Sequence, residues 1–344
     1  MKKDIRRIES IDIVKGLCII LVIFGHSGNK VPLIPNFWYS FYMSAFFLFS
    51  GYLFKYKETT KKTIIHKIKS MYLLYLIWTI IPYSILGITR IIRGKLEIVK
   101  FIKIVGKIVL GIKCPREVAQ MWFICALFTV EILWIIIDKV FKTKKRKIVV
   151  SILLMIIGIV FNMLDIKELV FRVDTALIML PIFELGILYQ RNKENKIINS
   201  LVYMKLPLLI SLTIVYIILV ILHFNILKYT VSIAANDYGL FILFYINALL
   251  GTLLSINYAR KIYNKSKYIF KKILEYFMFI GTNSTISYIT MNILIYLNKN
   301  IIEKLFSLNK STISIITFIS MLVIQIPLIK LLKNKRCKYL LAKF

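Results

Sequence analysis

The sequence consists of long apolar segments that alternate with short connections rich in lysine and arginine. A transmembrane helix needs about 20 mostly apolar residues. Open strands cannot cross a bilayer, because the amides at their edges would stay unpaired. The pattern therefore predicts an all-α polytopic membrane protein, a single domain over residues 1–344, with about ten transmembrane helices. The predicted spans are, approximately, 10–28, 36–54, 71–90, 118–139, 148–165, 173–190, 205–225, 239–258, 276–298 and 311–332.

Composition excludes the main alternatives to a membrane protein. Apolar residues make up 59% of the chain and charged residues 19%, against roughly 45–50% and about 25% in ordinary soluble domains. One soluble core could not bury so much Ile, Leu and Phe, and the same richness in large side chains excludes intrinsic disorder. The Lys and Arg residues that give the net charge of +32 lie mainly in the connections between the apolar segments. Nucleic acid is therefore not an expected partner, and the lipid bilayer is.

Positive charge in the connections predicts the orientation. The N-terminus, the loops after even-numbered spans and the C-terminal tail carry 32 Lys and Arg, and the other connections carry 15. Because these residues concentrate on the cytoplasmic side, we expect a multi-pass plasma-membrane protein with both termini in the cytoplasm. The basic segment 90–116 is the exception. Its apolar residues, including Ile98, Phe101 and Ile102, recur at helical spacing and indicate an amphipathic helix at the interface.

The first predicted span carries the most informative polar residues, Asp12, Lys15 and His26. At about 100° and 1.5 Å per residue, Lys15 and His26 share a helix face roughly 16 Å apart, and Asp12 lies within about 40° of His26. Ionisable residues inside a span tend to be paired or functional. A neutral imidazole can take a proton from a hydroxyl or carry an acyl group, and a fixed cation suits a phosphate-bearing donor. The alternative is that Lys15 snorkels and His26 caps the interface.

Two carboxylates lie well inside other spans. Glu131 falls in segment 118–139 and Glu184 in segment 173–190, where a charge is expensive unless it is paired or protonated. Either carboxylate could orient His26 or bind a sugar hydroxyl, and the alternative is a hydrogen bond between helices. The four cysteines have no metal-ligand or redox spacing, so no metal site is predicted.

Further candidates are uncharged. Ser50 precedes Gly51, where either a site role or close helix packing is expected. Trp122 could stack on a sugar or belong to the aromatic belt of the membrane interface. Asn283 and Ser284 interrupt segment 276–298. An interrupted span is tolerated where it lines a cavity, which favours a role in binding.

Several motifs occur in a fixed order along the chain. The motifs are Asp12-Ile-Val-Lys15-Gly16 with Gly25-His26, the run from Phe41 to Tyr52 that includes Ser50-Gly51, Met121-Trp122-Phe123 with Ala126-Leu127-Phe128, Asp174-Thr175-Ala176 with Pro181 and Gly186, and Gly281-Thr282-Asn283-Ser284. Together they resemble the acyltransferase-3 family of integral membrane proteins over about residues 8–332, and more particularly its fucose 4-O-acetylase-like branch and the polysaccharide-intercellular-adhesin membrane acyltransferases.

This resemblance implies an O-acyltransferase. The family moves acyl groups, usually acetyl, from a cytoplasmic coenzyme A thioester to hydroxyls of envelope carbohydrates. The donor, acetyl-CoA or another short acyl-CoA, is a substrate and not a bound cofactor, and the machinery of envelope polysaccharide synthesis is a further implied partner. The family's essential basic residue and histidine correspond to Lys15 and His26. Many relatives carry Arg in place of Lys15, and many carry a histidine shortly after the Asn-Ser pair, where this chain reads Tyr288-Ile-Thr-Met-Asn292.

Two other function classes compete with the enzyme. A transporter or flippase for a lipid-linked glycan would be expected to show two related halves with matching broken spans. The sequence has one polar break, at 281–285, and no matching break in the first half. A catalytically silent scaffold is the third class, and the intact pair of Lys15 and His26 argues against it.

Overall fold

The computed structural model describes residues 9–28, 34–112, 114–192, 194–227, 230–306 and 308–342. Over these ranges the chain is helical, apart from connecting segments and one isolated β-bridge between Ser232 and Asp237. The predicted all-α class is therefore confirmed. The basic N-terminal residues 1–8, on which the orientation prediction partly depends, lie outside the described residues, as does Lys113 of the basic segment.

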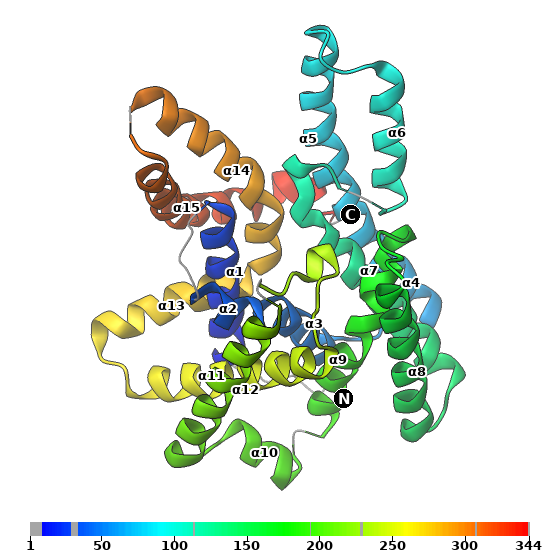
Figure 1. Cartoon of the computed structure of the whole chain (residues 1–344), viewed down its shortest axis with the longest axis vertical. Helices are drawn as coiled ribbons and strands as arrows, with labels where there is room; N and C mark the ends of the chain where they lie inside the picture. Colours follow the sequence, from blue (N-terminus) through cyan, green and yellow to red (C-terminus); the bar gives the residue numbers. More distant parts are fainter. Residues whose placement is uncertain are drawn as a thin grey trace.

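The α-helices run in chain order and are drawn in Figure 1. A π-helical turn, Ile68–Tyr72, joins α4 to α5. The helices are α1 (Glu9–His26), α2 (Ile34–Tyr39), α3 (Tyr42–Leu53), α4 (Thr60–Lys67), α5 (Leu73–Ile92), α6 (Ile98–Val109), α7 (Trp122–Val140), α8 (Lys144–Met163), α9 (Val173–Arg191), α10 (Lys196–Val202), α11 (Leu206–Leu227), α12 (Phe241–Lys265), α13 (Tyr268–Thr282), α14 (Ser284–Leu305) and α15 (Lys310–Leu332).

Among the described residues, 6 helical stretches are long and apolar enough to cross a membrane. The protein is therefore a multi-pass membrane protein, while the count of ten spans stays a prediction. The other predicted segments are also helical, but 36–54 breaks between α2 and α3, and 276–298 breaks at Asn283 between α13 and α14. The 6 stretches are Thr60–Ile92, Val118–Val140, Lys144–Met163, Leu206–Ile226, Phe241–Lys265 and Lys310–Leu332.

Helices α1 and α9 lie at the centre of the bundle. Helix α1 packs against α3, α12, α13 and α14, and α9 packs against α3, α7 and α8. Most side chains of both helices are buried. In contrast, α11 exposes apolar side chains over much of its surface, as a lipid-facing helix does. The charges of Asp12, Lys15 and Glu184 are therefore on helices that the rest of the protein shields from lipid.

Two helix crossings depend on glycines of the sequence motifs. Helix α1 meets α13 where a Cβ added to Gly281 would lie 1.8 Å from the carbonyl oxygen of Asp12. Helix α3 meets α9 where a Cβ on Gly51 would lie 1.9 Å from the carbonyl oxygen of Phe183. Backbones approach this closely only where no side chain separates them. The reciprocal approaches are made by Gly16 and Gly186. Close packing therefore accounts for these glycines.

Polar contacts join the connections at each end of the bundle. Helix α8 carries Lys147 near one end and Asn162 near the other, roughly 22 Å apart at 1.5 Å per residue. At the first end, Asp138 of α7 accepts hydrogen bonds from Lys147 at 2.5 Å and from Tyr56, beyond α3, at 2.8 Å. At the second, Asn162 donates to the carbonyl oxygen of Asn236, beyond α11, at 2.6 Å. The segment after α3 and the end of α7 thus lie at one end of α8, and the segment after α11 lies at the other. Which end faces the cytoplasm stays a prediction.

The basic segment 90–116 contains the expected amphipathic helix, α6. Its Phe101 ring stacks on Tyr83 of α5, with centroids 5.5 Å apart and planes 8° apart. Ile98 and Ile102 are 61% and 62% exposed on its other side. Helices α5 and α6 lie side by side and extend away from the rest of the bundle (Figure 1). The location of α6 at a membrane interface stays a prediction.

Candidate active site

The first of two cavities along α1 contains Lys15. It has a volume of about 290 Å³, and its polar lining includes Lys15, Ser50, Lys67, Glu131 and Ser284. We call it the lysine cavity. It lies at the end of the bundle where Asp138 holds the connections together, because Glu131 is only two turns before Asp138 on α7 and Lys67 ends α4.

Two ion pairs set the electrostatics of the lysine cavity. The Lys67 ammonium lies 2.7 Å from the Glu131 carboxylate, and their side chains are 14% and 5% exposed. The Lys15 ammonium lies 3.7 Å from the Asp12 carboxylate. Water scarcely reaches these groups, so each charge depends strongly on its partner. Since Asp12 is not part of the lining, the cavity wall presents two lysines against one glutamate and can receive an anionic group.

The second cavity contains His26, at the C-terminal end of α1. It has a volume of about 340 Å³, and its lining includes His26, Tyr39, Tyr42, Gln120 and Trp122, together with residues 230–234 beyond α11. We call it the histidine cavity. Its described lining contains no carboxylate and includes the rings of Tyr39, Tyr42, Trp122 and Tyr288. It lies at the end of the bundle opposite the lysine cavity, where Asn162 and Asn236 meet.

A buried arginine supports the wall of the histidine cavity from behind. The guanidinium of Arg172 donates to the carbonyl oxygen of Ala234 at 3.0 Å and lies 5.7 Å from the centre of the Trp122 ring. Both Ala234 and Trp122 line the cavity. Arg172 is 5% exposed, and its Nε lies 3.9 Å from the Asp174 carboxylate. The side chain therefore fixes two parts of the wall at once.

The backbone around this arginine is strained. Phe171 and Arg172 have φ values of 55° and 54°, in the left-handed region that residues with a Cβ rarely adopt. Such strain persists where surrounding contacts impose it. Here the Phe171 amide donates to the Leu110 carbonyl at 2.7 Å, and its own carbonyl accepts from Thr129 at 2.6 Å. These two hydrogen bonds fix the segment before α9 and therefore hold Arg172 in place.

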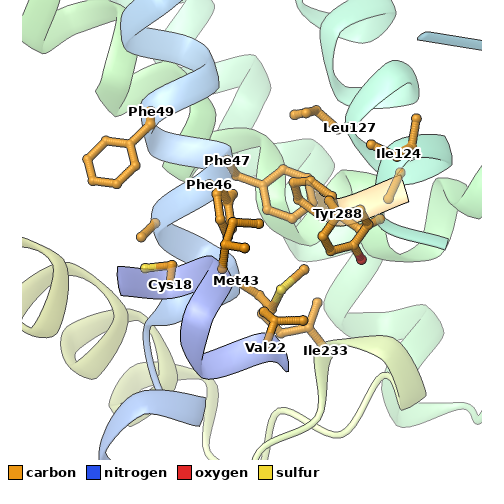
Figure 2. Close-up of a cluster of buried hydrophobic side chains, with 14 of the residues drawn as sticks. Cys18, Val22, Met43, Phe46, Phe47, Phe49, Ile124, Leu127, Ile233 and Tyr288 are labelled. Atoms are coloured by element: carbon orange, nitrogen blue, oxygen red, sulfur yellow. The ribbon is translucent and has the colours of Figure 1, made fainter. Parts of the chain in front are cut away.

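A thin layer of side chains separates the two cavities. On α1, Ile19 lines the lysine cavity and Val22 lines the histidine cavity, and Phe46 and Met43 divide in the same way on α3. Three residues of helix span about 4.5 Å, so the layer is one turn thick. Figure 2 shows the side chains of Val22, Met43 and Phe46, with those of Phe47 and Tyr288, gathered between α1, α3 and α7. We call this layer the partition.

Tyr288 of α14 belongs to both cavities. It is 3% exposed and is part of each lining. Its hydroxyl donates to the carbonyl oxygen of Gln120 at 2.5 Å, and its ring packs edge-to-face on Phe123 with centroids 5.3 Å apart. The direct route from Lys15 to His26 is thus closed by side chains that belong to the partition.

The structure divides the predicted site residues between the cavities. Lys15, Ser50, Glu131 and Ser284 line the lysine cavity, with Asp12 reaching it through Lys15. His26 and Trp122 line the histidine cavity, and Asn283 lines a third cavity, described below. Glu184 is buried on α9 and lines none of the three.

Sequence reasoning missed several residues of the site. Lys67, Gln120, Arg172 and Tyr288 each contact a predicted residue or divide the cavities. In the sequence, Lys67 and Arg172 lie in connections, where their charges were used to predict the orientation of the protein. They were therefore not considered as residues of the site. Tyr288 could have been singled out, because it follows the polar break at Asn283 by five positions.

The fold and the cavities define a multi-pass membrane protein with reactive groups inside its helical bundle. The profile of the acyltransferase-3 family, described as an acyltransferase domain, matches residues 8–330. The chain belongs to this family and is a membrane acyltransferase. No curated protein and no solved structure matches the chain. The predicted family is thereby confirmed in preference to a transporter or a scaffold, and the predicted branch stays a prediction.

Proposed function

We propose that the protein transfers a short acyl group, in the simplest case acetyl, from a coenzyme A thioester to a hydroxyl of an envelope carbohydrate. One observation carries the proposal. Lys15 and His26 lie on the same central helix but line separate cavities, at opposite ends of the bundle, with a partition one helical turn thick between them. This arrangement suits a donor and an acceptor that arrive from opposite sides of a membrane.

The donor binds in the lysine cavity. Coenzyme A is polyanionic, and this is the cavity whose wall presents two lysines against one glutamate. The predicted orientation places this end of the bundle in the cytoplasm, where acyl-CoA is found. Lys15 lies deepest along α1, next to Ile19 of the partition. It guides the donor arm toward that layer.

His26 acts as the base in the histidine cavity. The imidazole takes the proton of the acceptor hydroxyl while the hydroxyl oxygen attacks the carbonyl carbon of the thioester. The tetrahedral intermediate then expels the coenzyme A thiolate, which takes the proton back from the imidazolium. The same ring is also placed to carry the acyl group transiently. Trp122, Tyr39 and Tyr42 offer flat apolar faces to a sugar ring.

Gln120 offers a donor for the developing oxyanion. Its side chain is 1% exposed, and its Nε2 has no hydrogen-bond partner among the described residues. A buried amide without an acceptor is uncommon and calls for an explanation. A fixed donor near the reacting carbonyl lowers the barrier, because it is already oriented before charge develops.

The test uses membranes from cells that express matched amounts of wild type, His26→Ala or His223→Gln. Acetyl-labelled coenzyme A is supplied, and label in envelope glycans is followed by mass spectrometry. His26→Ala is expected to lose about 10²–10⁴-fold in transfer, as the removal of a general base does. His223 lines a different cavity, so its variant should retain transfer.

Each other outcome has a definite meaning. Equal labelling by His26→Ala and wild type would remove His26 from the chemistry. Label in a lipid or a protein, with none in glycans, would move the acceptor to another class. No label from any variant, with several short acyl donors and folded protein, would show that the donor is not an acyl-CoA.

A further inference from the structure

A third cavity adjoins the lysine cavity. Its volume is about 550 Å³, and its lining includes two charged side chains, Lys69 and Lys333, together with His66. Ser70, Leu74 and Thr285 line both this cavity and the lysine cavity, so the two are neighbours that share a wall. We call it the basic cavity.

The charge of the basic cavity is not neutralised by its own lining. No Asp or Glu occurs among the described residues that form it. In the lysine cavity, by contrast, Lys67 is held 2.7 Å from Glu131. Uncompensated cations on a concave wall raise the local concentration of anions. The basic cavity therefore selects a ligand that carries negative charge.

Two structural elements bring the cations together. Lys69 belongs to the π-helical turn Ile68–Tyr72, and Lys333 follows the last residue of α15. A π-helical turn shifts the side chains that follow it around the helix axis, and such turns are frequent at functional sites. Ser70 and Met71 of the same turn line the lysine cavity. The turn thus presents residues to both cavities.

The break between α13 and α14 forms another part of the wall. Thr285 and Ile286, in the first turn of α14, line the cavity together with Thr282 and Asn283 at the end of α13. The Asn283 side chain donates to the carbonyl oxygen of Phe279 at 2.7 Å, and the Ile286 amide donates to the carbonyl oxygen of Asn283 at 2.9 Å. Because the dipoles of the two helix ends oppose each other here, the positive charge of the cavity comes from its lysines.

The remaining wall is apolar and comes partly from the C-terminal segment. Leu74, Ile286, Leu341 and Ala342 line the cavity, and this surface suits the flat ring of a nucleobase. The C-terminal segment is tied to α5, because the indole nitrogen of Trp78 donates to the carbonyl oxygen of Leu340 at 2.8 Å. The cavity thus combines cationic groups with an apolar surface.

We infer that the basic cavity binds the phosphate-bearing nucleotide end of the donor thioester. The lysine cavity takes the arm that carries the acyl group. This assignment rests on the proposed function, because the adjacency of the two cavities has this meaning only for a donor long enough to occupy both. An anionic lipid headgroup offers the same phosphate chemistry, and the experiment separates the two sources.

Binding is measured on the full chain in nanodiscs of phosphatidylcholine, with adenosine 3′,5′-bisphosphate as the probe. The double variant Lys69→Gln/Lys333→Gln is compared with wild type and with Lys61→Gln/Arg336→Gln. The control removes the same charge from α4 and from the C-terminal segment, at exposed residues outside the linings of the three cavities. The first double variant is expected to bind about tenfold or more weakly, since it loses two charge-assisted contacts. The control should match wild type.

Kinetics sharpen the assignment. With acyl-CoA, Lys69→Gln/Lys333→Gln should raise KM with little change in kcat. With S-acetylpantetheine, which lacks the nucleotide, it should match wild type. All four substituted side chains are exposed, so the thermal unfolding of both double variants should match that of wild type. Each single variant allows the same comparison of KM values with half the loss of charge.

The outcomes separate this inference from the proposed function. Unchanged affinity for the bisphosphate in the double variant overturns the inference, whether or not acyl transfer is detected. If that affinity is unchanged while the double variant, in nanodiscs that also contain phosphatidylglycerol, loses the enrichment of this lipid around the protein, the cavity is a lipid site. Lysine-dependent binding of the bisphosphate without any acyl transfer supports the inference and rejects the proposed function. Transfer with an unchanged KM for acyl-CoA rejects the inference alone.

Discussion

The lysine cavity and the histidine cavity have similar volumes, about 290 and 340 Å³, but opposite chemistry. In the lysine cavity, ammonium and carboxylate groups form the wall itself. In the histidine cavity, the charges of Arg172 and Asp174 lie behind the wall, and the wall itself consists of aromatic, aliphatic and uncharged polar side chains together with His26. A charge in the wall of a cavity can contact a ligand, whereas a charge behind the wall supports the shape of the cavity. His26 is the one imidazole among the described residues of this lining, and an imidazole can serve as a general base.

The largest effect is expected from removing a charged group that supports the wall of the histidine cavity. Asp174→Ala leaves the buried guanidinium of Arg172 without its carboxylate and removes the acceptor of the Asn236 amide. Removing one partner of a buried pair costs about 3–5 kcal/mol of unfolding free energy. Denaturation of the purified protein in detergent measures this loss, and the KM for the acceptor should rise more than the KM for the donor.

The control for this variant is Asp165→Ala. Asp165 pairs with Lys167 at 2.7 Å, but its side chain is 82% exposed. An exposed ion pair contributes about 0–1 kcal/mol, so the control should unfold almost as wild type does. Equal stability of the two variants would show that Arg172 does not depend on Asp174.

The next effect concerns the lysine cavity. Glu131→Gln leaves the ammonium of Lys67 without a countercharge and should lower the unfolding free energy by about 1.5–3 kcal/mol, the worth of a hydrogen bond to a charged group. The variant also makes the cavity more positive by one charge. The KM for the anionic donor is therefore expected not to rise, in contrast to the rise in acceptor KM for Asp174→Ala.

Two measurements decide whether Glu131 only neutralises Lys67. The double variant Lys67→Met/Glu131→Gln should recover most of the lost stability, because no unpaired charge is left buried. A clear rise in donor KM for Glu131→Gln would instead mean that the carboxylate contacts the donor directly.

A smaller effect tests the partition between the cavities. Tyr288→Phe keeps the ring and removes the hydrogen bond to the Gln120 carbonyl, which is worth about 1 kcal/mol. Because that bond holds the ring where it closes the route, acetate release from acetyl-CoA without acceptor should rise about fivefold. Tyr245→Phe is the matched control, since its hydroxyl donates to the Ile178 carbonyl at 2.7 Å outside both linings. Equal acetate release by both variants would mean that the Tyr288 hydroxyl does not hold the route closed.

The sequence was sufficient for the features that depend on one helix. Helix α1 is continuous from Glu9 to His26, and Lys15 and His26 line different cavities along it. The polar break at Asn283 separates α13 from α14, and Ser284 beyond it lines the lysine cavity. Helical periodicity and the cost of buried polar groups act locally, and both can be read from a single segment.

Features that depend on two segments were not accessible in this way. Glu131 and Glu184 look equivalent in the sequence, yet Glu131 lines a cavity and Glu184 does not. The difference arises because α4 places Lys67 beside α7, a contact that bridges 64 positions. The support of Asp174 by Asn236 likewise links residues 62 apart. Helix packing decides such pairs, and no periodicity encodes it.

The smallest effect is expected for the most conservative change in the lysine cavity, Lys15→Arg. Both side chains carry a permanent charge next to Asp12, and the guanidinium adds the option of two parallel bonds to a phosphate. If Lys15 acts through its charge, Lys15→Arg should keep the donor KM within about threefold of wild type, while Lys15→Gln raises it about tenfold. Both variants should leave the KM for the acceptor unchanged, because the partition separates Lys15 from the histidine cavity. Equal loss of activity in Lys15→Arg and Lys15→Gln would mean that the shape of the ammonium group matters and not its charge.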